Sequence, residues 1–229
     1  MTENHEKKHC DCQKHNNNTL IKQYFEYSYK FIIFSFVIAF LAMLVSKKDK
    51  VRLILFIEIL ITGISGYMYY LFTKSMNKTK EEPDLHYINV LRYNGWSFST
   101  PLMVTVLCLV LSASTNIALK LRTLLTIIGL DYVMLLFGYL GELGKIDRIT
   151  ATVLGFIPFF AMFYIIFTTF IQKYNLFNYV VFFVYFILWS GYGIAYLLDD
   201  YTKNIITNFL DVTAKGVFAV GLSTYYTFF

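Results

Sequence analysis

The chain has 229 residues, of which 57% are hydrophobic, 19% aromatic and only 15% charged, and its formal net charge is +5. This composition excludes an ordinary soluble domain and indicates a protein that crosses a lipid bilayer several times. Basic residues are not interleaved with exposed stacking aromatics, because the aromatics lie within the apolar runs, so no nucleic acid is expected as a partner.

The first 28 residues form a polar segment that precedes the apolar runs. We expect it to be a disordered tail, since it lacks the cleavage site of a signal peptide. A metal site or an interchain disulfide is the alternative, but the spacing fits no standard zinc pattern. The residues that raise this alternative are His5, His9, His15, Cys10 and Cys12.

Apolar runs of about twenty residues, the length that crosses a roughly 30 Å hydrocarbon core, recur throughout residues 29–229. Because the gaps between them are short, they predict one all-α integral membrane domain, a seven-transmembrane-helix bundle. The runs are 29–46, 52–73, 88–111, 121–141, 151–171, 177–198 and 203–225.

Basic residues in the short loops predict the orientation of this bundle, since such residues stay on the cytoplasmic side. The first, third and fifth loops are basic, whereas the other loops are mixed or acidic. The N-terminus is therefore predicted outside and the C-terminus cytoplasmic. The basic loop residues are Lys47, Lys48, Lys50, Arg52, Lys120, Arg122 and Lys173.

Asp211 and Lys215 lie near the middle of the seventh run, four residues apart and so on one helical face. A charge at that depth costs about 3 kcal/mol or more, so these residues mark either a functional site or an ion pair that joins helices.

Other polar residues interrupt the apolar runs. Glu58 faces a partner or a water-filled path, or else snorkels to the headgroups. Asp131 has no evident cation nearby, and we expect it to be protonated and hydrogen-bonded. Pro101 frees a backbone carbonyl in the third run, and a Ser or Thr one turn earlier is expected to satisfy it.

Motifs on the third, fourth, sixth and seventh runs resemble the microbial (type 1) rhodopsins, and the resemblance covers all seven runs. Asp211 to Lys215 is similar to the retinal-attachment motif of that family. The third run contributes Arg92-Tyr93, Trp96 and Thr100-Pro101, the fourth Asp131, Met134 and Gly138, and the sixth Trp189 and Tyr192.

This resemblance implies all-trans retinal, covalently bound to Lys215 as a Schiff base, with Asp211 as its counterion. A lysine amine desolvated in an apolar pocket can condense with an aldehyde in this way. The retinal pocket implied by the family consists of Tyr93, Trp96, Thr100, Pro101, Asp131, Met134, Gly138, Phe159, Met162, Trp189, Tyr192, Tyr196 and Ala214.

Two departures from the family pattern bear on function. Gly95 stands where outward proton pumps carry an acidic acceptor, and Val106 stands where they carry a donor. Since neither residue can hold a proton, a conventional outward proton pump is not expected.

The charges around Lys215 leave an excess of one positive charge if Arg92 points inward. Either an anion such as chloride sits beside Gly95, held by Ser99 and Asn94, or Arg92 swings outward to an acidic residue. The outward candidates are Asp199 and Asp200.

The predicted function is a light-gated ion channel and not an enzyme, with Ser35, Glu58 and Asn208 along the pathway for inorganic ions. Glu58 is similar in position to a gate carboxylate of channelrhodopsins, which favours cations. The composition also resembles the rhodopsins of giant algal viruses. A chloride pump or anion channel, or a photosensor with a membrane partner, is the alternative. The family often forms trimers or pentamers, in the plasma membrane of a host cell or in an internal membrane.

Overall fold

A computed structural model describes the backbone of residues 2–78, 84–115, 117–171 and 175–228. Side chains are described for the same residues apart from 2–17 and 78. The predicted roles of the histidines and cysteines in the first 17 residues therefore lie outside the described side chains.

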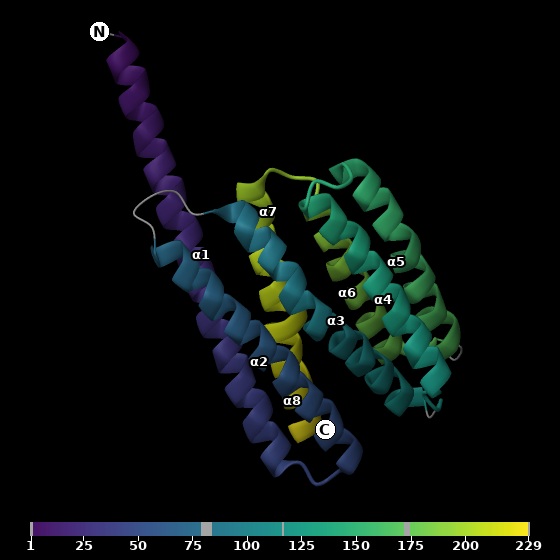
Figure 1. The fold of residues 1–229 in the computed structure, drawn as a ribbon. Coiled ribbons are helices and arrows are strands. Elements are labelled where there is room, and N and C mark those ends of the chain that lie inside the picture. The colour runs from purple at the N-terminus through teal and green to yellow at the C-terminus, as the bar shows by residue number, and fades with distance from the viewer. Residues whose placement is uncertain (1, 79–83, 116, 172–174, 229) are drawn as a thin grey trace.

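The described residues form an all-helical bundle in which seven helices are long and apolar enough to cross a membrane (Figure 1). This confirms the predicted fold class and a multi-pass integral membrane protein. The seventh span is built from three consecutive segments, α7, η1 and α8. The bounds are α1 Thr2–Val45, α2 Asp49–Lys78, α3 Leu85–Thr115, α4 Leu121–Glu142, α5 Arg148–Phe170, α6 Leu176–Ala195, α7 Asp200–Asp211, η1 Val212–Val217 and α8 Phe218–Phe228.

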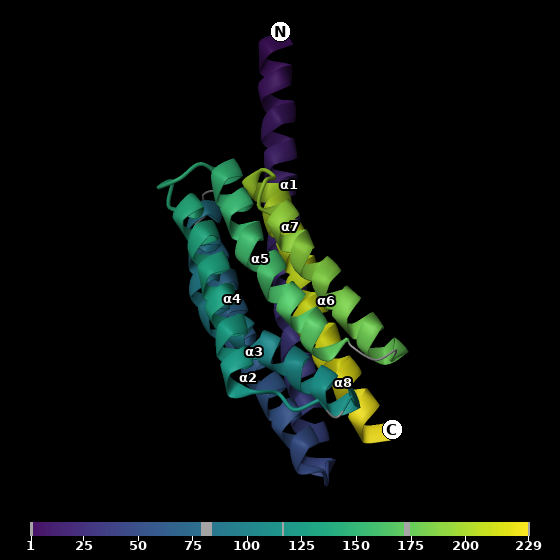
Figure 2. The ribbon, with the colours of Figure 1, turned by 90° about the vertical axis from the view of Figure 1, so that its right-hand side faces the viewer.

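The first span begins earlier than the sequence predicted. Helix α1 runs unbroken from Thr2, so residues 2–28 are helical where a disordered tail was expected. Its membrane-compatible part starts at Asn18 and not at 29, and its first turns project beyond the rest of the bundle (Figure 2). The extracellular position of this segment stays a prediction.

The seventh span, formed by α7, η1 and α8, packs against helices from both sides of the bundle. Helices α1 and α2 pack on one side and α4, α5 and α6 on the other, with α3 between them (Figure 1). The chain starts and ends at opposite ends of the bundle, as seven crossings require (Figure 2). Because the seventh span packs against α1, α2, α3 and α6, its polar residues can contact several other helices.

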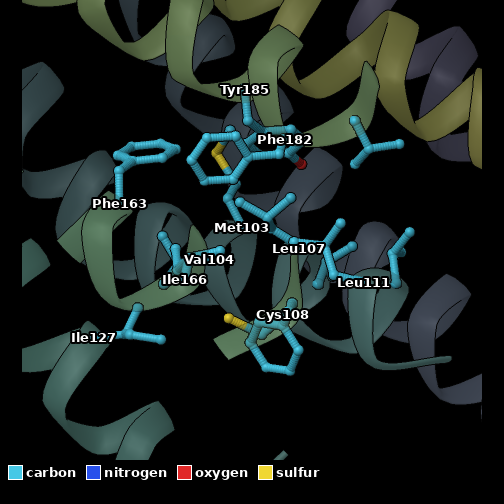
Figure 3. Close-up of a cluster of buried hydrophobic side chains, with 14 of the residues drawn as sticks. Met103, Val104, Leu107, Cys108, Leu111, Ile127, Phe163, Ile166, Phe182 and Tyr185 are labelled. Atoms are coloured by element: carbon cyan, nitrogen blue, oxygen red, sulfur yellow. The ribbon is translucent and has the colours of Figure 1, made fainter. Parts of the chain in front are cut away.

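The half of the bundle that contains the C-terminal part of α3 has a continuous apolar core (Figure 3). Val106, at the position of a proton donor in outward pumps, is fully buried in this core. The core therefore separates the centre of the bundle from its predicted cytoplasmic end. Its labelled members are Met103, Val104, Leu107, Cys108 and Leu111 of α3, Ile127 of α4, Phe163 and Ile166 of α5, and Phe182 and Tyr185 of α6.

Pro101 lies inside α3 and cannot donate to the carbonyl of Ser97, four residues earlier. The Tyr132 hydroxyl of α4 donates to this carbonyl at 3.0 Å. The freed carbonyl is thus satisfied from a neighbouring helix, and not by a hydroxyl of α3 as the sequence predicted. Thr100 bonds instead to the carbonyl of Trp96, at 2.9 Å.

Asp199 begins the seventh span as the N-cap of α7. Its Oδ1 accepts hydrogen bonds from the backbone N–H groups of Tyr201 and Thr202, at 3.1 and 3.0 Å. These bonds, above all those from Thr202, hold the pKa of the Asp199 carboxyl below its usual value. The cap contributes stability while the carboxyl is ionised, and this stability is lost as the pH falls through the lowered pKa.

We predict that Asp199→Ala destabilises the protein by about 1 kcal/mol at pH 7, because α7 loses its cap. The difference from the unaltered protein should shrink when the pH falls below the unfolded-state value of about 3.9. Thermal unfolding of the purified protein at neutral and acidic pH measures this. Asp199→Asn is the matched control, since its amide oxygen caps the helix at every pH; equal destabilisation by Ala at all pH values would contradict the prediction.

Candidate functional site

Lys215 lies at the centre of the bundle, in the π-helical segment η1 that interrupts the seventh span. Short π-helical segments within α-helices occur frequently at functional sites. Its side chain is 4% exposed, and its Nζ donates to Asp211 Oδ1 at 2.5 Å. The predicted pair is therefore formed, and both of its members are buried.

Asp211 accepts hydrogen bonds from four side chains, each from a different segment. Arg92 Nη1 of α3 and the Tyr69 hydroxyl of α2 each lie 3.0 Å from Oδ2. The Tyr192 hydroxyl of α6 lies 2.9 Å from Oδ1, beside Lys215 Nζ. Four bonds fill the lone-pair sites of a carboxylate, and two of the donors are cations, so the ionised form is stabilised.

Arg92 points inward. Besides Asp211, its Nη2 donates to Asn204 Oδ1 at 3.1 Å and to Asn208 Oδ1 at 2.5 Å. The outward alternative is not adopted, because Asp199 caps α7 and Asp200 bonds to Arg148 at 2.7 Å.

Aromatic rings surround the remaining face of Arg92. Its guanidinium carbon lies 4.9 Å from the ring centre of Phe72, 5.2 Å from Phe25 and 5.7 Å from Tyr69. Ring faces attract a cation, most strongly where both are removed from water. Rings and amide oxygens therefore stabilise the excess positive charge, an arrangement that the sequence analysis did not consider.

The space beside Gly95 is occupied by a neighbouring side chain. A Cβ atom at Gly95 would come within 2.6 Å of Met68 Cγ. The small cavity lined by Gly95, Ser99 and Lys215 has a volume of about 10 Å³, enough for about one water molecule. Asn94 is exposed on the outer face of α3, so its predicted place in this region is wrong.

A larger cavity extends from Lys215 between α3, α4, α5 and α6. Apolar and aromatic walls with an amine at one end suit a long apolar aldehyde such as retinal. Trp96 lies 6.0 Å from Lys215 Nζ, measured to its ring centre. The predicted pocket residues that line this cavity are Tyr93, Trp96, Thr100, Met134, Gly138, Phe159, Trp189, Tyr192 and Tyr196.

The other predicted pocket residues are not part of the cavity lining. Asp131 is fully buried and contacts Thr100, which lines the cavity; its Oδ2 lies 2.8 Å from Thr100 Oγ1. Since Thr100 has one hydroxyl hydrogen and donates it to Trp96, a protonated Asp131 that donates to Thr100 satisfies both contacts. Pro101 is half-buried, while Met162 and Ala214 are buried in the adjoining apolar core.

Comparison with known proteins decides the family. The family model described as bacteriorhodopsin-like protein matches residues 22–227. The chain belongs to this family and is a microbial rhodopsin. Family membership implies a retinal chromophore bound to a lysine.

Several relatives of this rhodopsin are known. A green-light absorbing proteorhodopsin from Gamma-proteobacterium EBAC31A08 is 36% identical over 83 residues, and the matched stretch spans 36% of this chain but only 30% of that relative. The crystal structure of viral rhodopsin OLPVRII is 31% identical with a TM-score of 0.84, covering 90% of this chain and 97% of that one. Xanthorhodopsin, described as a light-driven ion pump with dual chromophore, matches in fold at 22% identity and a TM-score of 0.76, covering 93% and 94%.

The rhodopsin contains functional residues that the sequence analysis missed. Tyr69 bonds to Asp211, and Asn204 accepts a hydrogen bond from Arg92. Met68 fills the space beside Gly95. A spacing signal for Asn204 was present, because residues 204, 208, 211 and 215 are polar and share one helical face. Met68 gives no such signal, since its role depends on the approach of α2 to Gly95.

A second buried ion pair also lines the large cavity of this rhodopsin. Lys203 Nζ lies 2.7 Å from Glu142 Oε1 and 3.0 Å from Asp200 Oδ1. Lys203 is therefore a second buried lysine near the cavity, but two carboxylates hold its amine. Lys215 has one carboxylate partner among the described residues and faces the aromatic walls.

We predict that Lys215→Arg abolishes the visible absorption that forms when the protein is mixed with all-trans retinal. Arginine keeps the positive charge but has no primary amine to condense with the aldehyde. Absorption spectra of the purified variants measure this, with circular dichroism to verify that the helices remain. If Lys215→Arg kept its colour and Lys203→Arg lost it, retinal would be attached to Lys203, which would contradict the prediction.

Proposed function

We propose that this rhodopsin is a light-gated ion channel that conducts cations, with retinal attached to Lys215 Nζ and Asp211 as its counterion. One observation carries the proposal. Polar faces of α2 and α7 meet at the centre of the bundle, while the acceptor and donor positions of outward pumps hold Gly95 and Val106.

The retinal site rests on the surroundings of Lys215. When bound, retinal supplies a conjugated chain that changes shape on absorbing light. Trp96, Trp189 and Tyr192 line the cavity around this chain and restrict where it can move. Lys215 Nζ, held by a single carboxylate in an apolar setting, is the atom whose displacement reaches the polar network.

An outward proton pump would need acids on both sides of Lys215. Among the described residues, Asp211 is the one carboxylate bonded to Lys215, and Arg92, Tyr69 and Tyr192 already bond to it. On the other side, Val106 is surrounded by apolar side chains. Gly95 and Val106 therefore cannot supply the usual pair of proton-exchanging groups.

The pathway that we propose for ions begins in the outer half of the bundle. Asn89, Asn204 and Asn208 form a chain of amides along α3 and α7, connected through Arg92. Displacement of Lys215 would remove one partner from Asp211 and loosen this network. The pathway continues along the buried residues Ser35 and Glu58 toward the cytoplasmic side.

Acidic side chains favour cations as the conducted species. Glu58 is a buried acidic residue in the apolar half of the bundle, and acidic side chains that line a pore favour cations. Asp200 and Glu142 add negative charge at the outer end, where Lys203 and Arg148 balance them.

Anion transport is the second candidate, and the excess positive charge of Lys215 and Arg92 over Asp211 favours it. The side chain of Met68, however, lies against Gly95 and limits the room for a chloride there. We therefore rank the anion candidate second.

Patch-clamp recording of illuminated mammalian cells that express the chain and receive all-trans retinal tests the proposal. We expect a photocurrent that reverses sign with voltage and whose reversal potential follows the cation gradient. A current of one sign at every voltage would indicate a pump, and a reversal potential that moves only when chloride is replaced would indicate an anion channel.

We predict that Asn208→Leu lowers this photocurrent several-fold, because leucine has similar volume but no polar atoms for the pathway. Thr213→Val is the matched control, since the Thr213 hydroxyl bonds only to the carbonyl of Phe209 in its own helix. Photocurrents normalised to the amount of pigment measure the effect. Equal currents in the two variants would exclude Asn208 from the pathway.

A further inference from the structure

A groove on the surface of the bundle lies between α1 and the seventh span, and it shares no lining residue with the large cavity beside Lys215. Its volume is about 790 Å³, far above the roughly 10–15 Å³ that one water molecule needs. The wall formed by the seventh span is apolar and consists of Ile205, Ile206, Phe209 and Val212. Because both walls belong to membrane-spanning helices, the groove opens toward the lipid bilayer.

The α1 wall of the groove contains a row of hydroxyl groups. Tyr24, Tyr27, Ser28 and Phe31 follow the spacing i, i+3, i+4, i+7, which places them on one face of α1. Ser28 is only 5% exposed, yet neither its hydroxyl nor those of Tyr24 and Tyr27 bonds to another residue in the part of the chain that the structure describes. Since buried polar groups are normally hydrogen-bonded, the Ser28 hydroxyl indicates a polar ligand at this position.

Lys30 supplies a positive charge at the edge of this row. Its Nζ lies 5.9 Å from the ring centre of Tyr27, so the side chain extends back toward the start of α1. Glu26 lies one turn away, but it does not line the groove, and Lys30 forms no ion pair within the described ranges. An ammonium group beside three free hydroxyls is a set of donors that suits the oxygens of a phosphate group.

The polar and apolar parts of the groove are ordered by depth in the membrane. At 1.5 Å per residue, Lys30 and Tyr24 lie about 22 and 32 Å from Val45, the last residue of α1. The hydrocarbon core is about 30 Å thick, so these two residues lie near its boundary. Along the seventh span, Phe209 and Val212 continue the groove toward the centre of the bundle. A lipid has the same order, with a polar head group followed by an apolar chain.

We propose that this groove binds one phospholipid of the surrounding bilayer, with an anionic head group at Lys30 and an acyl chain along Phe31, Phe209 and Val212. The Tyr27 and Ser28 hydroxyls donate to the phosphate oxygens, and the Lys30 ammonium group balances the negative charge. The site is separate from the retinal cavity and from the proposed ion pathway, so it does not depend on the proposed function.

The groove is also connected to the segment that carries Lys215. A Cβ atom at Gly216, the residue after Lys215, would come within 2.8 Å of Phe31 Cε1. Phe31 therefore packs against η1 and also lines the groove, so a chain bound there holds α1 against the seventh span. A ligand that binds only the folded protein stabilises it, and the phospholipid should do so here.

Native mass spectrometry tests the proposal on the full chain, after incorporation into vesicles of equal parts phosphatidylglycerol and phosphatidylcholine and return to a mild detergent. We expect one phosphatidylglycerol retained per chain, in preference to phosphatidylcholine. Lys30→Gln should weaken this retention about five-fold, the contribution of one basic residue near an anionic lipid. Lys74→Gln is the matched control, because Lys74 Nζ lies 5.8 Å from the ring centre of Tyr70 but does not line the groove.

A second pair of variants changes the shape of the groove without changing any charge. Ile206→Trp fills the groove and should abolish the retention of phosphatidylglycerol. Ile187→Trp should not, since Ile187 is 65% exposed on α6 and lies outside the groove. Added phosphatidylglycerol should raise the melting temperature of the unaltered protein, measured by circular dichroism, but not that of Ile206→Trp.

Equal retention of the two phospholipids, or equal losses in Lys30→Gln and Lys74→Gln, would overturn the proposal. So would unchanged retention in Ile206→Trp. A change of oligomeric state in Ile206→Trp without loss of lipid would assign the groove to a second copy of the chain and would also contradict the proposal. None of these measurements needs retinal or a photocurrent, so their failure is distinct from a failure of the proposed function.

Discussion

The arrangement of the helices around the site depends on the burial of a single carboxylate, Asp211, between two cations. It binds Lys215 and Arg92 and accepts bonds from Tyr69 and Tyr192, so it links α2, α3, α6 and the seventh span. Loss of one partner from a buried ion pair costs about 3–5 kcal/mol, because the other charge is left unpaired. Any movement of Lys215 therefore changes the interactions of Asp211 with residues of α2, α3 and α6 as well as within the seventh span. A local change at Lys215 can in this way affect the packing of four helices.

The two halves of the bundle differ in chemistry. The half that is predicted to face outward contains amides, Arg92 and a second buried ion pair, Lys203–Glu142, all connected by hydrogen bonds. The half that is predicted to face the cytoplasm is an apolar core with a few buried polar residues on α2, α6 and α8. In the proposed channel this contrast corresponds to a closed state, because an apolar core excludes hydrated ions.

Much of the bundle and of its centre was predictable from the sequence, because both depend on spacing within one helix. The seven apolar runs and the pairing of Asp211 with Lys215 are of this kind. The roles of Tyr69 and Met68 depend on which faces of different helices meet, and no spacing within one helix shows this. Asn94 was placed beside the site, but its position on α3 turns it outward. The helical start of α1 was missed because its polar residues carry no apolar period.

Asp211, aromatic rings and amide oxygens together stabilise the charges of Arg92 and Lys215, so we predict that the site requires no bound anion. Replacing chloride with a large anion such as gluconate, while recording the visible absorption spectrum of the purified pigment, tests this most directly. An anion within a few ångströms of Lys215 would alter the charge next to the chromophore and hence its colour. We expect a spectrum that does not change with the anion. A shift of the absorption maximum that saturates with halide concentration would contradict it.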